Sequence, residues 1–128
     1  MLDHITLRVS DLEKSRRFYA LALQPLGYEI LKEGASVGFG VEDVDGKRNF
    51  WIKKGEVTGV PSFSCLAFRA PCKKSVEAFH EVGLKAGGKD NGAPGYRPKY
   101  HRGYYSAFVL DPDGYNIEVF FHDLSSGV

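Results

Sequence analysis

The sequence predicts an α+β protein made of two βαβββ modules, which form a cupped, barrel-like mixed sheet with the helices outside. A strand-like segment at residues 4–9 recurs at residues 65–70, an offset of 65 − 4 = 61 residues. An amphipathic helical pattern follows each of these segments. Each half also carries an Asp-Gly turn, at residues 43–46 and 111–114, with an offset of 111 − 43 = 68. Asp-Gly pairs favour tight hairpins because glycine accepts a positive φ.

The first strand of each half alternates between apolar residues and residues of other kinds, as a half-buried strand does. If the apolar residues pack beneath a helix, the alternate residues face the concave side of the sheet. The apolar residues are Ile5, Leu7 and Val9, then Leu66, Phe68 and Ala70; the predicted cup-facing residues are His4, Thr6 and Arg8, then Cys65, Ala67 and Arg69.

Each helix has a predicted beginning and end. Ser10 and Glu13 have the spacing of a capping box, which predicts that the first helix begins there, and the helix ends before Pro25. The second helix begins after Pro71, and the pair Gly87–Gly88 ends it. Further strands are predicted at residues 28–31, 37–41 and 50–53, weakly near 89, and at 104–110 and 115–122.

The second half is longer than the first by 68 − 61 = 7 residues, and the extra residues lie within Gly87–Gly103. This stretch has five glycines and two prolines and is predicted to be a long loop. It also carries aromatic and basic side chains, which are common in functional loops. A surface loop held by its own aromatic residues explains the same composition, so both interpretations stay open.

Composition favours one soluble domain of 128 residues, with modules at about 1–60 and 61–123. The chain is 43% hydrophobic and 26% charged, as ordinary globular proteins are. Its net charge of +1, from 17 basic and 16 acidic residues, argues against nucleic-acid and membrane-surface partners. No leader-like or long apolar segment is evident, so a cytoplasmic location is expected.

Three segments resemble the glyoxalase/bleomycin-resistance/extradiol dioxygenase superfamily, also called the vicinal oxygen chelate superfamily. They are residues 2–5, residues 10–15 with Phe18-Tyr19, and the Asp-Pro-Asp-Gly turn with its following strand at residues 111–118. Residues 91–95 with 103–105 are similar to a glyoxalase-like subgroup whose members mostly lack assigned substrates. The resemblance covers nearly the whole chain and implies small-molecule ligands and, for many members, dimers.

The resemblance also implies a divalent metal ion at the centre of the cup. His4 matches the first-strand histidine and Glu118 the last-strand glutamate, while Cys65 stands where a second histidine is usual. Phe50 or Trp51 occupies the place of a fourth ligand. A thiolate favours zinc over nickel, manganese or iron. In the alternative, no metal binds, Cys65 is a small core residue, and His4 and Glu118 bond to each other or to Arg8 or Arg69.

Glu118 lies in the middle of a strand between apolar neighbours, where a carboxylate is costly unless it is paired or ligated. We therefore expect it to face the cup. The resemblance further implies that it is the catalytic residue of a glyoxalase-like lyase or isomerase. His101 and His122 are further candidate metal ligands. Predicted substrate-binding residues are Arg8, Arg69, Trp51, Tyr100, His101 and Tyr105.

The resemblance implies three alternative functions. The first is a metal-dependent lyase or isomerase acting on a small carbonyl compound. The second is a metal-free protein that binds or sequesters a small molecule in an aromatic pocket, with no cofactor. The third, an extradiol dioxygenase, is disfavoured because Cys65 replaces the second histidine that Fe(II) needs. A homodimer is expected, and the cup is formed either within one chain or between two.

Overall fold

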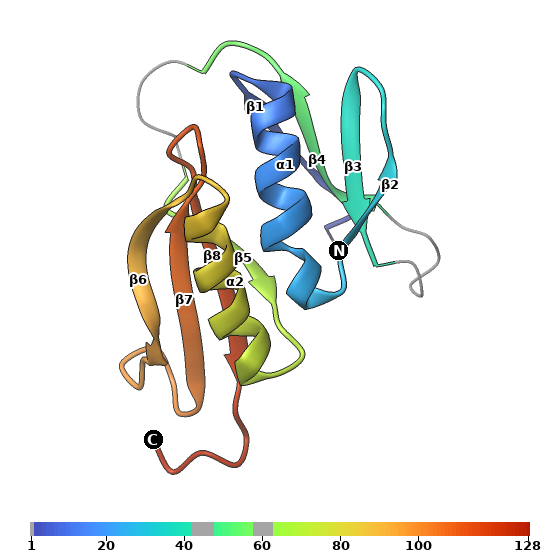
Figure 1. The fold of residues 1–128 in the computed structure, drawn as a ribbon. Coiled ribbons are helices and arrows are strands. Elements are labelled where there is room, and N and C mark those ends of the chain that lie inside the picture. Colours follow the sequence, from blue (N-terminus) through green and yellow to red (C-terminus); the bar gives the residue numbers. More distant parts are fainter. Residues whose placement is uncertain (1, 42–47, 58–62) are drawn as a thin grey trace.

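The computed structural model describes residues 2–41, 48–57 and 63–128. Within these residues the chain forms two α-helices, one short 3-10 helix and eight strands in two four-stranded mixed sheets (Figure 1). The predicted turn at residues 43–46 lies outside the described residues. None of the described helices is long and apolar enough to cross a membrane.

The first half folds as one βαβββ module. Its first strand is parallel to its last, and the sheet order is β1-β4-β3-β2. The elements are β1 (Ile5–Val9), α1 (Leu12–Ala22), η1 (Gln24–Leu26), β2 (Glu29–Lys32), β3 (Ser36–Gly40) and β4 (Arg48–Lys54).

The second half repeats this topology, with the sheet order β5-β8-β7-β6 and β5 parallel to β8. The α+β class and the two-module architecture predicted from the sequence are therefore confirmed. The elements are β5 (Leu66–Arg69), α2 (Lys73–Lys85), β6 (Lys89–Tyr96), β7 (Tyr104–Leu110) and β8 (Asn116–His122).

The stretch Gly87–Gly103, predicted as a long loop with a weak strand near residue 89, contains the edge strand β6. Its pairing with β7 shifts register between Asp90 and Gly92 and again between Gly92 and Gly95. Glycines are tolerated in strands at such irregular edge positions, because a missing side chain costs little packing there. Only residues 97–103 connect β6 to β7 without strand structure.

Helix α1 is capped differently from the capping box predicted on Ser10 and Glu13. The N-cap is Asp11, whose carboxylate accepts a hydrogen bond from the backbone N–H of Lys14 at 3.1 Å. Ser10 instead bonds to Asp113 of the second half, through its backbone N–H at 3.0 Å and its hydroxyl at 2.5 Å. Because Ser10 bonds to Asp113, the N-cap of α1 lies one residue later than predicted.

The helix-facing sides of the two sheets share one hydrophobic core. Phe50 on β4 and Phe68 on β5 are both buried, and their ring centroids are 5.2 Å apart. Tyr28 contacts the same Phe68 ring from the first half, at 5.4 Å. Helices α1 and α2 lie side by side over this core (Figure 1). The two modules are therefore packed through their helix-facing sides.

Hydrogen bonds fix the Asp-Pro-Asp-Gly turn of the second half to the first half. The buried Tyr19 hydroxyl on α1 donates to the Asp111 carboxylate. The Tyr115 hydroxyl donates to the backbone carbonyl of Arg8 at 2.8 Å. Together with the Ser10–Asp113 bonds, these contacts set the position of one module against the other.

Candidate functional site

The first strands of both halves alternate as the sequence predicted. Leu7 and Val9 in β1 are buried, and so are Phe68 on β5 and Ala70 directly after it. The alternate residues of these two segments are exposed: Thr6, Arg8, Cys65, Ala67 and Arg69. Each sheet therefore has an outer face that points away from the shared core.

Glu118 lies on the outer face of the second sheet, and only 3% of it is exposed. One oxygen of its carboxylate accepts a hydrogen bond from the Tyr104 hydroxyl at 2.5 Å, and the other accepts one from the Cys65 thiol at 3.5 Å. Both oxygens act as acceptors, which is the arrangement that suits an ionised carboxylate. Glu118 is held in place by Tyr104 on β7 and by Cys65 directly before β5.

The two donors around Glu118 retain their protons at neutral pH. Burial, reinforced by the hydrogen bond to Glu118, raises the pKa of the Tyr104 phenol well above its ordinary value. Burial and the Glu118 charge also raise the pKa of the Cys65 thiol. Cys65 and Tyr104 are therefore uncharged hydrogen-bond donors, and neither group neutralises the carboxylate.

A cavity of about 330 Å³ opens beside Glu118. Small-molecule sites are commonly concave and largely apolar, with a few polar groups at fixed positions. Here the polar groups include a carboxylate, an amide and a thiol, and the rest of the wall is mostly aromatic. The lining residues are Ser64, Cys65, Tyr100, Tyr104, Phe108, Asn116 and Glu118, all from the second half.

An aromatic cluster borders this cavity. The Tyr104 ring packs against Phe120 with centroids 4.3 Å apart and against Tyr100 at 5.1 Å. His101 contacts Tyr104 at 4.8 Å and His122 at the same distance. The predicted binding residues Tyr100 and His101 therefore belong to this region, and both are exposed.

Other predicted residues lie elsewhere. His4 is exposed and bonds to its neighbour Asp3 at 2.8 Å, not to Glu118. Trp51 lies over Gly38 on the first sheet, and its indole N–H donates to the Arg48 carbonyl at 3.0 Å. The structure thus brings Cys65 and Glu118 together and leaves His4 and Trp51 on the other sheet.

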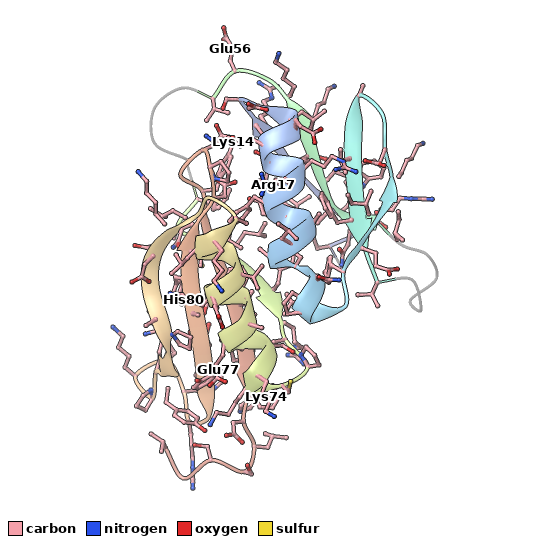
Figure 2. The ribbon with its side chains drawn as sticks, in the orientation of Figure 1. Lys14, Arg17, Glu56, Lys74, Glu77 and His80 are labelled. Atoms are coloured by element: carbon pink, nitrogen blue, oxygen red, sulfur yellow. The ribbon has the colours of Figure 1, made fainter. Side chains whose placement is uncertain are left out.

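Three more predicted binding residues are also outside the cavity. Arg8 lies on β1 with its side chain beside Gly55. Arg69 lines a separate hollow of about 190 Å³ between the halves, with Asp3. Tyr105 is 7% exposed and faces the helix layer, where its hydroxyl donates to Glu77. Glu77 lies on α2 (Figure 2).

The residues at Glu118 do not fit a divalent metal within one chain. Among the described residues, no three His, Cys, Asp or Glu side chains gather where they could bind one ion. The cavity offers two such groups, Cys65 and Glu118, whereas protein zinc sites use three or four ligands. In the first sheet, Trp51 stands at the register position of Glu118, because Thr6 pairs with Trp51 as Ala67 pairs with Glu118.

Tyr104, Phe108 and Asn116 line the cavity but were not among the residues predicted from the sequence. Phe108 pairs directly with Glu118 across β7 and β8, so register could have identified it once that hairpin was known. Tyr104 reaches Glu118 from farther along β7, and alternation alone does not reveal such a contact. The one available signal was that Tyr104 and Phe108 are an even number of residues apart, which places both side chains on the same face of β7.

Comparisons with known proteins agree with this architecture. The family model described as Glyoxalase/Bleomycin resistance protein/Dioxygenase superfamily matches residues 1–119. Among curated proteins, no match is found. A glyoxalase/bleomycin resistance protein from Albidiferax ferrireducens T118 is similar in structure, with 27% identity and a TM-score of 0.79. That alignment covers 93% of this chain and 96% of the other.

Two further structures have the same fold. A glyoxalase I mutant from Zea mays has 25% identity and a TM-score of 0.71, over 93% of this chain and 46% of that one. The chain therefore spans about half of the maize protein. The fosfomycin resistance protein FosX from Mesorhizobium loti has 21% identity and a TM-score of 0.71, over 98% and 94% of the two chains.

Proposed function

Because the chain belongs to the glyoxalase/bleomycin resistance protein/dioxygenase superfamily, we propose that it binds a small organic molecule without a metal ion, in the cavity beside Glu118. The observation that carries this proposal is the pairing of Glu118 with two neutral donors in an aromatic cavity. These two hydrogen bonds hold the carboxylate in position without a metal ion. It leaves the space next to the carboxylate for a ligand.

Binding and metal content test this proposal together. Protein purified without a histidine tag is analysed for metals by mass spectrometry. A small-molecule library is then screened by NMR on labelled protein. We expect no stoichiometric metal and ligand-induced shifts at Cys65, Tyr104 and Asn116, with Trp51 unaffected. Stoichiometric metal that Glu118→Ala abolishes, or ligands that map away from the cavity, would overturn the proposal.

A second candidate is a glyoxalase-like, metal-dependent lyase acting on a small carbonyl compound. It is favoured by His4 and Glu118 at the positions that match the superfamily's ligands and by the likeness to maize glyoxalase I. In this version, two chains form a homodimer, and the first sheet of one chain faces the second sheet of the other. His4 of one copy would then join Cys65 and Glu118 of the second copy.

The lyase candidate makes separate demands. It requires a dimer in analytical ultracentrifugation, metal binding that both His4→Ala and Glu118→Ala weaken, and turnover of the methylglyoxal–glutathione adduct. Thr6→Ala, on the same exposed face as His4 but without a ligating group, is the matched control. A monomer, or metal binding unaffected by His4→Ala, would exclude this arrangement.

A further inference from the structure

Glu118 is a buried acid that has no counter-ion among residues 2–41, 48–57 and 63–128. Among the described residues, no Lys, Arg or His side chain forms an ion pair with it. Its two hydrogen bonds come from an uncharged phenol and an uncharged thiol. A buried charge is expensive unless an opposite charge accompanies it. One wall of the cavity therefore carries the negative charge of Glu118, which no positive side chain among the described residues balances.

The other walls of the cavity also favour positive charge. Tyr100, Tyr104 and Phe108 line it with Glu118. The faces of aromatic rings carry partial negative charge and attract ammonium and guanidinium groups, most strongly where water is excluded. An anionic ligand would be repelled by the Glu118 carboxylate.

A cation already uses one of these rings. The Arg97 guanidinium lies 5.1 Å from the centroid of the Phe108 ring. Its N–H groups donate to the Ser106 hydroxyl at 2.8 Å, the Ala93 carbonyl at 2.9 Å and the Ser106 carbonyl at 3.2 Å. Arg97 is thus held by oxygens other than those of Glu118 and is not among the residues that line the cavity.

We infer that the ligand of this cavity is an organic cation, an ammonium compound with a short apolar body. Its nitrogen would lie between the Glu118 carboxylate and the rings of Tyr104 and Phe108. Asn116 offers an amide to a polar group at the other end of the ligand. This inference rests on the proposed binding function and adds the charge class of the ligand to it.

The test compares two ligands of equal shape on the unmodified protein. Choline is titrated by calorimetry beside its neutral isostere, in which a carbon atom replaces the quaternary nitrogen. We expect choline to bind about tenfold more tightly, since a desolvated cation gains the ring and carboxylate attraction. Equal binding of the two compounds would overturn the inference. So would the finding that zinc binds stoichiometrically to Glu118 and displaces choline.

Two variants locate the effect. Glu118→Gln removes the charge and is expected to abolish the preference for choline. Glu81→Gln removes an exposed charge that pairs with Lys85 outside the cavity and is expected to leave the preference intact. If Glu118→Gln does not fold, Tyr100→Leu at the exposed wall serves instead, with weaker choline binding expected. A preference unchanged in Glu118→Gln or, failing that, in Tyr100→Leu would contradict the inference.

The outcomes distinguish a failure of the cation inference from a failure of the proposed small-molecule binding function. Neutral or anionic molecules that bind at Cys65, Tyr104 and Asn116, while cations do not, would preserve the binding function and overturn the charge class. A library that yields no ligand for the cavity, with choline also failing to bind, would overturn both.

Discussion

Tyr104 matters at the scale of single residues because its hydroxyl holds one oxygen of a carboxylate that is almost fully buried. Removing the hydroxyl in Tyr104→Phe leaves that oxygen without its donor. We expect the free energy of unfolding, measured by urea denaturation, to fall by about 1 kcal/mol. Tyr100→Phe is the control, because this exposed side chain loses the same atom and its hydroxyl is not one of the two donors that bond to Glu118. Equal losses in the two variants would refute the role given to Tyr104.

Asp111 gives the stability a defined pH dependence. Burial raises the pKa of its carboxyl from 3.8 to about 6, although Tyr19 and two backbone N–H groups partly offset the shift. The folded state therefore binds the proton more readily than the unfolded state, so the Asp111 contribution to stability rises as the pH falls from 7 through 6 towards 4.

Urea titrations at several pH values isolate this contribution. The difference in stability between the wild type and Asp111→Asn should change between pH 7 and 4, in favour of the wild type at lower pH. Other carboxyl groups titrate in both proteins and cancel in the difference. A difference that stays constant over this range would contradict the assignment.

At the same scale, the sequence predicted part of the site. The mid-strand position of Glu118 between apolar neighbours was enough to place it on the outer face. The repeat identified Cys65 as the counterpart of His4, and the family resemblance grouped Cys65 with Glu118. His4 has the correct parity, yet it lies on the other sheet. Alternation along a strand tells which face a side chain takes, but it does not tell how two sheets are oriented relative to each other.

At the scale of elements, β3 and β4 depend on a close contact between Gly38 and Trp51. A Cβ atom added at Gly38 would lie 2.9 Å from two carbons of the indole ring. Gly38→Ala must therefore displace the ring, and Trp51 is the only tryptophan in the chain. We expect its fluorescence emission to shift to longer wavelength and the stability to fall by about 1–2 kcal/mol.

Gly34→Ala provides the matched control for this prediction. A Cβ atom at Gly34 would meet nothing within 4 Å, so emission and stability should stay near the wild-type values. Unchanged emission in Gly38→Ala would show that the ring adapts without leaving its position.

The predicted elements were confirmed where periodicity was strong, as in β1, α1, α2, β7 and β8. The predictions failed where a distant residue decided the local structure. Asp113 binds Ser10, so Asp11 takes the cap of α1. Strand β6, predicted only weakly near residue 89, extends to Tyr96 despite its glycines because the β7 edge supplies pairing partners. Neither effect can be recognised from local sequence alone.

For the whole molecule, the shared core predicts that the two halves unfold together. Phe68 is 7% exposed and packs on Phe50 and Tyr28 of the other half. Phe68→Ala is expected to lower the free energy of unfolding by about 3–5 kcal/mol. Although the change lies in the second half, Trp51 fluorescence in the first half should report the same loss as far-UV circular dichroism.

Two separate transitions in this experiment would contradict a common core.

The sequence repeat established that the halves are alike, but it did not show through which sides they pack. That arrangement depends on Phe50, Phe68 and Tyr28 meeting across the modules. Such contacts join residues far apart in the chain and leave no periodic signal.

The matching register of Trp51 and Glu118 has a consequence for how such a protein changes over time. Packing constrains the helix-facing sides of both halves, because they share one core. The cavity on the outer face of the second sheet, in contrast, is lined by residues of the second half. One copy of a duplicated unit can therefore keep an acid while the other replaces it with an indole, and neither change disturbs the common scaffold. Duplication of this kind lets two surfaces diverge in chemistry while their framework stays fixed.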